Sequence, residues 1–266
     1  MRSSPLTRWL LPVVAALLMV PAQADEAEDR GLAIAQEADR RDSGFVDNEA
    51  ALTMILHGPG GQSSRRSLRI RILESTDPDM GDKSLVVFDE PRDIAGTALL
   101  SHTRILDPDD QWVWLPEVAR VKRISGTNRS GAFMGSEFAY EDLAAPEVAK
   151  FAYRHLRDEP CGDNLTCHVV ERRPLYADTG YSRQEVWLDV EEFRPWKITF
   201  HDRRGDHFKT LEYADFHQYG KFWRAHRMVM TNHRNGRSTE LVASGYRFGV
   251  GFTESDFSQA SLRRVR

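Results

Sequence analysis

The stretch GTALLSHTRILDPDDQWVWLPEVARVKRISGTNRSGAFMGSEFAYEDL, residues 96–143, decides the fold that we predict for this chain. Residues 96–100 and 111–115 have the apolar and aromatic character of two short strands. The Asp-Pro-Asp-Asp run between them, residues 107–110, is typical of a turn, because proline fixes φ and aspartate hydrogen-bonds the local backbone. The stretch therefore predicts antiparallel sheet.

The end of the same stretch combines a polar loop, residues 126–131, with large apolar side chains. Phe133, Met134 and Phe138 follow on a backbone interrupted by glycine. This part of the sequence offers no nucleophile with a neighbouring base. Aromatic and methionine side chains beside flexible loops favour an apolar cavity over a reaction centre.

Working outward, the chain shows strand periodicity in both directions. In residues 68–72, Leu, Ile and Ile alternate with two arginines, which indicates a half-buried strand with a basic outer face. Apolar runs recur at regular spacing over residues 166–248, and Asn235-Gly236 is a strong hairpin signal. Helical periodicity is confined to residues 26–41 and 139–156.

These runs predict a mainly β (α+β) fold of about ten or eleven strands in series. A single antiparallel sheet, curled into an unclosed half-barrel with helices covering its concave face, accounts for this order with the fewest assumptions. We expect residues 25–266 to form one domain.

Residues 1–24 have the three parts of a secretory signal peptide. Arg2 and Arg8 form the positive region, residues 9–20 the apolar core, and Ala-Gln-Ala at residues 22–24 the cleavage site. The core is well short of the ~20 residues that span a bilayer. We therefore predict cleavage after Ala24 and export to the periplasm. The formal net charge of −4 gives no basic excess to attract nucleic acid.

The two cysteines, Cys161 and Cys167, predict a disulfide in an oxidising compartment, with free thiols as the alternative. The ring is small, so its stabilisation is roughly 2 kcal/mol at best. A redox motif of the Cys-x-x-Cys kind would need a shorter spacing.

The sequence holds no recognisable metal or catalytic motif. It has nine histidines, of which His201 and His207 flank a predicted hairpin, but no His-Glu-x-x-His and no zinc-ligand spacing. A Gly-x-Ser-x-Gly nucleophile elbow is also missing. We expect no metal, no cofactor and no enzymatic activity.

The remaining signal is a set of large apolar side chains, for which ordinary core packing is the alternative interpretation. Taken together they would line the concave face of a half-barrel, where lipid would be the natural occupant. The predicted cavity or lid residues are Trp112, Trp114, Phe133, Met134, Phe138, Trp187 and Met228.

Four segments resemble the outer membrane lipoprotein-sorting protein family, a LolA-like group of exported bacterial proteins: residues 96–100, 109–116, 120–125 and 133–138. The resemblance implies an unclosed antiparallel barrel with an apolar cavity for acyl chains, periplasmic residence, and association with an inner-membrane transporter of the resistance-nodulation-division type. The chain is longer than the dedicated carriers and has a cysteine pair, so its cargo need not be a lipoprotein.

We therefore expect a non-enzymatic carrier or chaperone that takes a lipid or acylated protein cargo between envelope components, with transient membrane contact and no nucleic-acid partner. Two alternatives remain open at this stage. The same half-barrel could sense lipid and signal envelope stress to a membrane regulator, or the His201–His207 region could serve a secreted metal-dependent hydrolase.

Overall fold

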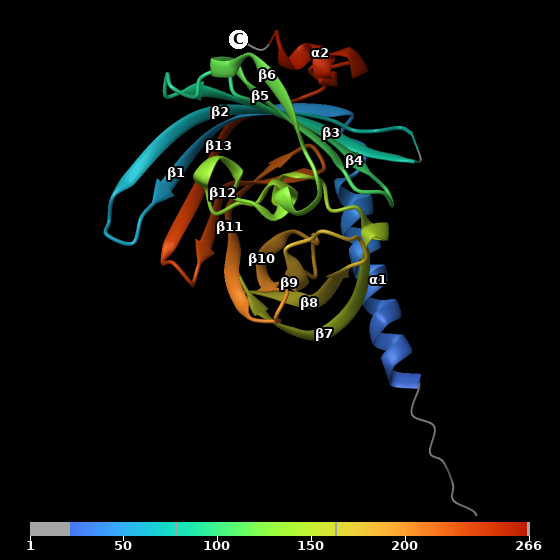
Figure 1. The fold of residues 1–266 in the computed structure, drawn as a ribbon. Helices are drawn as coiled ribbons and strands as arrows, with labels where there is room; N and C mark the ends of the chain where they lie inside the picture. The colour runs from blue at the N-terminus through green and yellow to red at the C-terminus, as the bar shows by residue number, and fades with distance from the viewer. Residues whose placement is uncertain (1–21, 78, 163, 265–266) are drawn as a thin grey trace, which may run out of the picture.

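The computed structural model describes residues 22–264 apart from residues 78 and 163, and it contains one antiparallel sheet of 13 strands (Figure 1). The strands are β1 (Asp47–His57), β2 (Ser63–Leu73), β3 (Met80–Glu90), β4 (Ala98–Arg104), β5 (Asp110–Leu115), β6 (Arg120–Ile124), β7 (Phe151–Cys161), β8 (Leu165–Pro174), β9 (Tyr181–Asp189), β10 (Pro195–Asp202), β11 (His207–Tyr219), β12 (Phe222–Asn232) and β13 (Arg237–Phe248). The helices are α1 (Ala22–Asp42) and α2 (Gln259–Leu262), with 3₁₀ turns η1 (Pro116–Val118), η2 (Gly126–Ser130), η3 (Phe133–Gly135), η4 (Tyr140–Leu143), η5 (Val148–Lys150) and η6 (Glu254–Phe257).

The sheet consists of two meanders joined side by side, the first formed by β1–β6 and the second by β7–β13. Its order is β6-β5-β4-β3-β2-β1-β13-β12-β11-β10-β9-β8-β7, so β1 pairs with β13 at the seam and β6 and β7 are the free edges. The sheet curls without closing, because the two edges do not pair (Figure 1). The predicted half-barrel is therefore confirmed, with more strands than the sequence pattern indicated.

Part of the predicted helical insertion is wrong. Residues 151–156 were expected to be helical, but they begin the edge strand β7. Phe151 and Tyr153 are buried while Ala152 and Arg154 are exposed, which is the period of a strand with one covered face. The pattern is short, and its alanines and charged residues are also good helix formers, so local propensity does not distinguish a helix from a strand here.

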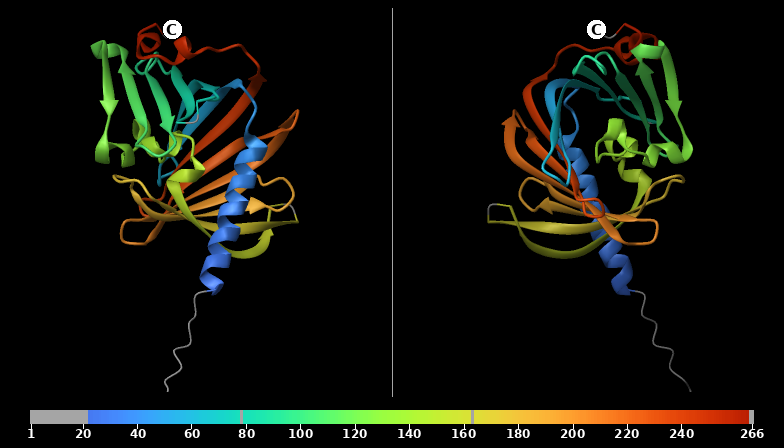
Figure 2. Two further views of the ribbon diagram at one scale, coloured as in Figure 1. Left: turned by 90° about the vertical axis from the view of Figure 1, so that its right-hand side faces the viewer. Right: turned by 60° about the vertical axis from the view of Figure 1, so that its left-hand side comes forward.

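The predicted N-terminal helix is present as α1, which packs chiefly on β7 and crosses the second meander (Figure 2). Its buried Ile34, with Ala35 and Ala38 beside it, joins the main apolar cluster. Residues 1–21 lie outside the described residues, and the expected cleavage site after Ala24 falls in the first turn of α1, so the signal peptide stays a prediction. Among the described residues, no helix combines the length and apolar character needed to cross a membrane.

Each face of the first meander is covered by a different segment. The run Ala98–Ser101 in β4 is buried at every position, as in a strand covered on both sides. Leu99 faces the main cluster in the hollow of the sheet, whereas Ala98 and Leu100 pack with Phe257 and Leu262 of the C-terminal segment on the outer face. We call the hollow side the concave face and the other side the convex face.

The predicted disulfide is confirmed. Cys161 and Cys167 are bonded across the β7–β8 hairpin, with 5.7 Å between their Cα atoms. Cys167 is fully buried on the convex face, where Val169, Trp187 and Trp196 pack around the bond.

Candidate functional site

The concave face is occupied by the segment that joins the two free edges of the sheet. We call this segment, residues 126–143, the plug. It follows β6, includes η2, η3 and η4, and leads through η5 into β7. Figure 1 shows it lying inside the curl of the sheet rather than over its outside. The plug therefore lies between solvent and the apolar concave face of the sheet.

Two aromatic side chains of the plug fill the interior. Phe133 is 1% exposed, and its ring lies 5.6 Å from that of Phe88 and 5.5 Å from that of Tyr140. Phe138 is also buried in the main cluster. Apolar burial of this kind stabilises a side chain by about 2 to 3 kcal/mol relative to exposure. The plug thus fills the hollow of the sheet with apolar side chains.

A buried ion pair fixes the C-terminal part of the plug. Lys209, on the concave side of β11, donates from Nζ to Asp142 Oδ2 at 3.0 Å, to Tyr181 Oη at 2.6 Å and to the Glu137 carbonyl at 3.2 Å. Tyr181 donates to Asp142 Oδ1 at 2.7 Å, and burial raises its pKa far above its usual range, so the phenol stays protonated. Both charged side chains are 5% exposed. Such a pair is tolerated in the interior because every charged atom has a partner.

Arginines from β2 and β13, the two strands on either side of β1, hold the middle of the plug. Arg66 Nη1 donates to the Met134 carbonyl at 2.5 Å, and Arg237 Nη2 donates to the Gly135 carbonyl at 3.1 Å. Met134 has φ of 48°, a left-handed conformation that costs a residue with a Cβ about 1 kcal/mol or more. The two guanidinium groups offset that cost by binding consecutive carbonyls.

Further contacts connect the plug to both meanders. Gln111, fully buried on β5, donates to the Tyr140 carbonyl at 2.9 Å. On the other side, the Glu137 amide donates to Thr239 Oγ1 at 2.9 Å, and Asn232 Nδ2 donates to the Glu137 carboxylate at 2.7 Å. These bonds are directional, whereas the contacts beneath them are apolar. Release of the plug would therefore break these polar bonds and uncover an apolar face.

A pair of carboxylates with raised pKa lies where the plug leads back to the sheet. Burial, with the neighbouring carboxylates of Asp82 and Asp39, raises the pKa of Glu147 to about 7. Burial also raises the pKa of Asp82 to about 6, against a hydrogen bond that the Ser75 amide donates. The folded protein thus holds protons on these groups that the unfolded chain, with ordinary values of 4.5 and 3.8, has already released.

We expect this pair to make stability fall as pH rises. The stabilisation is fully present below the unfolded-state values and is lost as pH passes through 6 and then 7. Because both groups are partly solvated, we expect a loss on the order of 2 kcal/mol between about pH 5 and pH 8. Urea unfolding across this range should show a flatter profile for Glu147→Gln than for wild type. Glu117→Gln, at an exposed position, should keep the wild-type profile; an equal slope in all three proteins would contradict the assignment.

The structure separates the apolar residues that the sequence grouped together. Phe133, Met134, Phe138 and Met228 belong to the concave cluster or pack against it. The other three lie on the convex face: Trp112 and Trp114 pack with Phe257 and Leu262, and Trp187 packs beside Cys167. Adjacent strand residues point to opposite faces, and Val113 takes the concave position on β5, so its two tryptophan neighbours point away from the concave face.

The polar residues that hold the plug were missed by sequence reasoning. Lys209 alternates with Leu211 and Tyr213, so one charged residue stands on an otherwise apolar strand face. This charged residue at a position where the alternation calls for an apolar one is the sequence feature that could have indicated a buried polar contact. Its partner Asp142 lies in a short turn 67 residues away, and no local pattern connects the two.

The histidines considered for a hydrolase make structural contacts. His201 Nδ1 lies 3.1 Å from the Gly205 carbonyl, inside the β10–β11 hairpin. His207 Nε2 lies 2.9 Å from Thr210 Oγ1, and Thr210 Oγ1 lies 2.8 Å from His233 Nε2. Burial, with His233 and His201 nearby, lowers the pKa of His207 and favours a neutral ring. These interactions support the hairpin, and among the described residues no serine or cysteine side chain hydrogen-bonds to the imidazole ring of His201 or His207.

A surface hollow of about 480 Å³ lies outside the concave cluster. Four of its seven lining residues are charged, which does not suit an acyl chain: Arg65, Asp89, Glu90 and Arg92, with Ser67, Pro91 and Ala95 completing the lining.

Known proteins are similar to this chain in both sequence and fold. A domain from Vibrio parahaemolyticus, assigned as an outer membrane lipoprotein-sorting protein, is 47% identical; the match covers 89% of this chain and all of that one, with a TM-score of 0.86. A DUF1329 family protein from Desulfovibrio piger is 27% identical over 89% of this chain and 99% of that one, with a TM-score of 0.84.

A LolA superfamily protein from Nitrosomonas europaea supports the fold alone, at 21% identity, 87% and 98% coverage and a TM-score of 0.69. A family model described as an uncharacterized protein matches residues 80–264. No curated protein matches the chain. The chain belongs to the outer membrane lipoprotein-sorting protein family and has a LolA-like fold.

Proposed function

We propose that this protein is a non-enzymatic carrier that binds the acyl chains of a lipid or lipidated protein on its concave face and passes them between components of the bacterial envelope. The observation that carries the proposal is the plug, whose buried Phe133 and Phe138 cover an apolar surface and are held there by polar contacts to both halves of the sheet. In the empty state the plug takes the place of cargo. In the loaded state the acyl chain would replace it.

The energetics suit reversible binding. An acyl chain of ~16 carbons hides on the order of 13 kcal/mol of apolar transfer free energy. A carrier must offset most of that amount, yet release the chain without fuel. Bound cargo would replace the apolar contacts that the plug makes on the concave face. The net free energy of binding is therefore the difference between the contacts that the cargo gains and those that the plug loses. That difference keeps transfer reversible.

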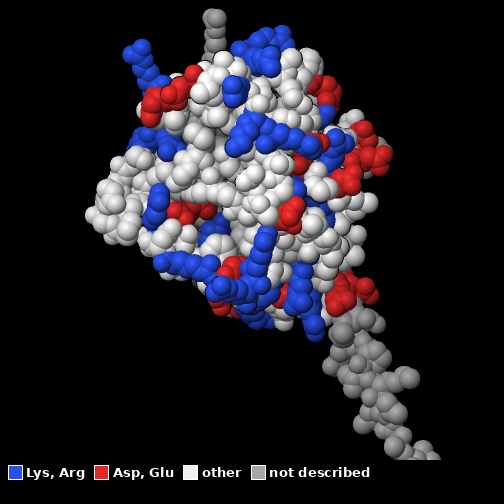
Figure 3. Space-filling model, in the orientation of Figure 1, with Lys and Arg blue, Asp and Glu red and all other residues white. Residues whose placement is uncertain are grey.

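An envelope location is part of the proposal. The predicted signal peptide, the disulfide and the lipoprotein-sorting assignment of the Vibrio relative support it. On the face drawn in Figure 3, positive and negative side chains are interspersed, which suits transient membrane contact better than lasting adhesion. We further propose an inner-membrane transporter of the resistance-nodulation-division type as the partner that delivers or receives the cargo.

Native mass spectrometry of the exported protein, purified without detergent, tests the proposal. We expect a bound mass that organic extraction identifies as a phospholipid or an acylated peptide. If the protein emerges empty, added phospholipid and diacylated lipopeptide should bind stoichiometrically. Failure of both to bind would contradict the carrier function.

A matched pair of substitutions locates the cargo. Met228→Trp places a larger side chain on the concave face of β12, and Val242→Trp places one at an exposed position of the neighbouring strand β13. We expect lipid affinity to fall about 10-fold, or about 1.4 kcal/mol, for the first and to stay unchanged for the second. Equal affinities in the two variants would place the cargo elsewhere.

A further inference from the structure

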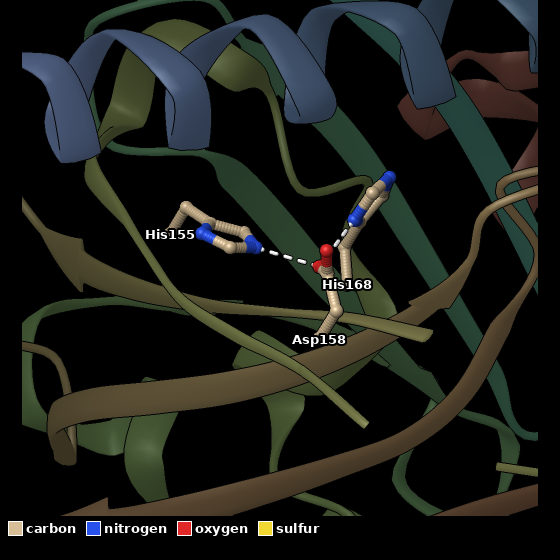
Figure 4. A group of neighbouring side chains, drawn as sticks. All are labelled: His155, Asp158 and His168. Atoms are coloured by element: carbon tan, nitrogen blue, oxygen red, sulfur yellow. Dashed lines mark hydrogen bonds and ion pairs between the residues drawn. The ribbon is translucent and has the colours of Figure 1, made fainter. Parts of the chain in front are cut away.

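Two histidines and an aspartate converge on one point under helix α1. Figure 4 shows the carboxylate of Asp158 between the rings of His155 and His168. Asp158 Oδ1 lies 2.7 Å from His155 Nε2 and 2.7 Å from His168 Nδ1. The two imidazole side chains are 10% and 16% exposed, so both rings are largely enclosed, whereas the side chain of Asp158 between them is 38% exposed. These three residues take no part in the contacts described for the plug or in the proposed binding of cargo.

A β-bulge brings the three side chains to the same face. Residues 155 and 158 are an odd number of positions apart, so in a regular strand they would point to opposite faces. In β7 the pairing slips between His155 and Arg157, which leaves Leu156 as an extra residue. Asp158 then pairs directly with His168 on β8 and shares its face. Bulges that re-aim a side chain are characteristic of functional positions.

Helix α1 covers the group at close range. A Cβ on Gly31 would lie 2.7 Å from the backbone of Arg154 and His155, so only glycine allows this approach. Arg30, the preceding residue, donates to Asp158 Oδ2 at 2.9 Å. That bond leaves Oδ1 directed at the two rings and holds the carboxylate in place, as outer partners do around metal sites.

We propose that His155, Asp158 and His168 bind one Zn²⁺ ion through Nε2, Oδ1 and Nδ1. Two imidazoles and one carboxylate, with a water in the fourth position, form a donor set that suits zinc. All three ligand atoms lie within 4.8 Å of one another. Zinc–ligand bonds of about 2.0 to 2.1 Å in a tetrahedral site separate neighbouring ligand atoms by about 3.3 Å. Each ring nitrogen now lies 2.7 Å from Asp158 Oδ1, so each ring needs to move about half an ångström away from that oxygen.

The donor set of the group suits a cation. Asp158 offers a carboxylate oxygen and each histidine a ring nitrogen, and all three atoms are directed at one point (Figure 4). Binding requires each imidazole to carry its proton on the ring nitrogen that faces away from Asp158. The ion would tie the bulged edge of the sheet together beneath α1.

A second cluster, Asp215, His217 and His226, provides the matched control. Its ligand atoms are equally close, but Asp215 and His217 have side chains that are 62% and 53% exposed. No helix covers it and no cation side chain orients its carboxylate among the described contacts. We expect weak binding there at most.

The test uses the full exported chain, stripped with a chelator and titrated with Zn²⁺ alone against a chromophoric competitor. We expect one equivalent to bind with a dissociation constant below about 1 µM. His168→Gln and Asp158→Asn should each weaken this binding by at least ~100-fold. His226→Gln should leave it within about 2-fold of wild type. Far-UV circular dichroism checks that each variant is folded.

Cobalt(II) gives an independent measurement, because a tetrahedral site with nitrogen and oxygen ligands shows intense visible bands. These bands should appear in wild type and His226→Gln and vanish in Asp158→Asn. No stoichiometric zinc in wild type would overturn the proposal, and so would binding that follows His226 rather than His168.

Discussion

Replacing Lys209 with methionine is expected to lower the free energy of unfolding by about 3 kcal/mol. Lys209 is 4% exposed, and its ammonium is the cation that faces the carboxylate of Asp142 in the plug. Methionine fills similar volume but leaves that carboxylate buried without its charge partner. Loss of one member of a buried ion pair costs more than the pair contributes, because the remaining charge stays desolvated. Urea denaturation with linear extrapolation measures the change.

An exposed lysine supplies the control. Lys122→Met on β6 removes the same charge at the surface and should change stability by no more than about 0.5 kcal/mol. Asp142→Asn combined with Lys209→Met should cost clearly less than the sum of the two single changes, because both break the same contact. Additive effects, or a loss for Lys209→Met no larger than for Lys122→Met, would show that the pair does not hold the plug.

Replacing Phe133 with alanine is expected to cost about 4 kcal/mol. The ring is 1% exposed and packs between Phe88 and Tyr140, so its removal loses both transfer free energy and the contacts of the atoms that line the gap. The gap would lie on the concave face and have apolar walls, so it should stay dry and accept a small apolar ligand. Urea unfolding gives the loss, and its recovery on adding benzene gives the occupancy of the gap.

The comparison for this change is Leu106→Ala, at a side chain that is 72% exposed. That variant should stay within about 0.5 kcal/mol of wild type and should show no response to benzene. A loss below about 1 kcal/mol for Phe133→Ala would mean that the plug does not pack into the hollow of the sheet as described.

Alternation in the sequence was sufficient to predict the sheet, because strands with one covered face repeat every second residue. It was insufficient where a strand lies at an edge. Phe151 and Tyr153 are the only buried side chains of β7, so the run gives a weak period and its alanines and charges mimic a helix. The curl and the two free edges follow from pairing of β1 with β13, a contact between the ends of the chain that no local pattern encodes.

The sequence pointed to some of the residues that face the hollow of the sheet. The apolar character of Phe133, Met134 and Phe138 located the plug, but residue size alone also selected Trp112 and Trp114, which face the other way. Long-range polar partners such as Asp142 and Lys209 have no signature in sequence. The group of His155, Asp158 and His168 was not predicted. In a regular strand residues 155 and 158 would point to opposite faces, and only the bulge at Leu156 brings their side chains to the same face.

The central claim is that cargo takes the place of the plug on the concave face. Hydrogen exchange of the plug amides, measured with and without bound diacylated lipopeptide, tests it most directly. The amides of Ser136 and Tyr140 are bonded within the plug, to the carbonyls of Phe133 and Gly131. We expect these two amides to exchange faster when cargo is bound, while amides of β11 and β12 stay protected. Stoichiometric cargo binding with unchanged exchange in the plug would contradict it.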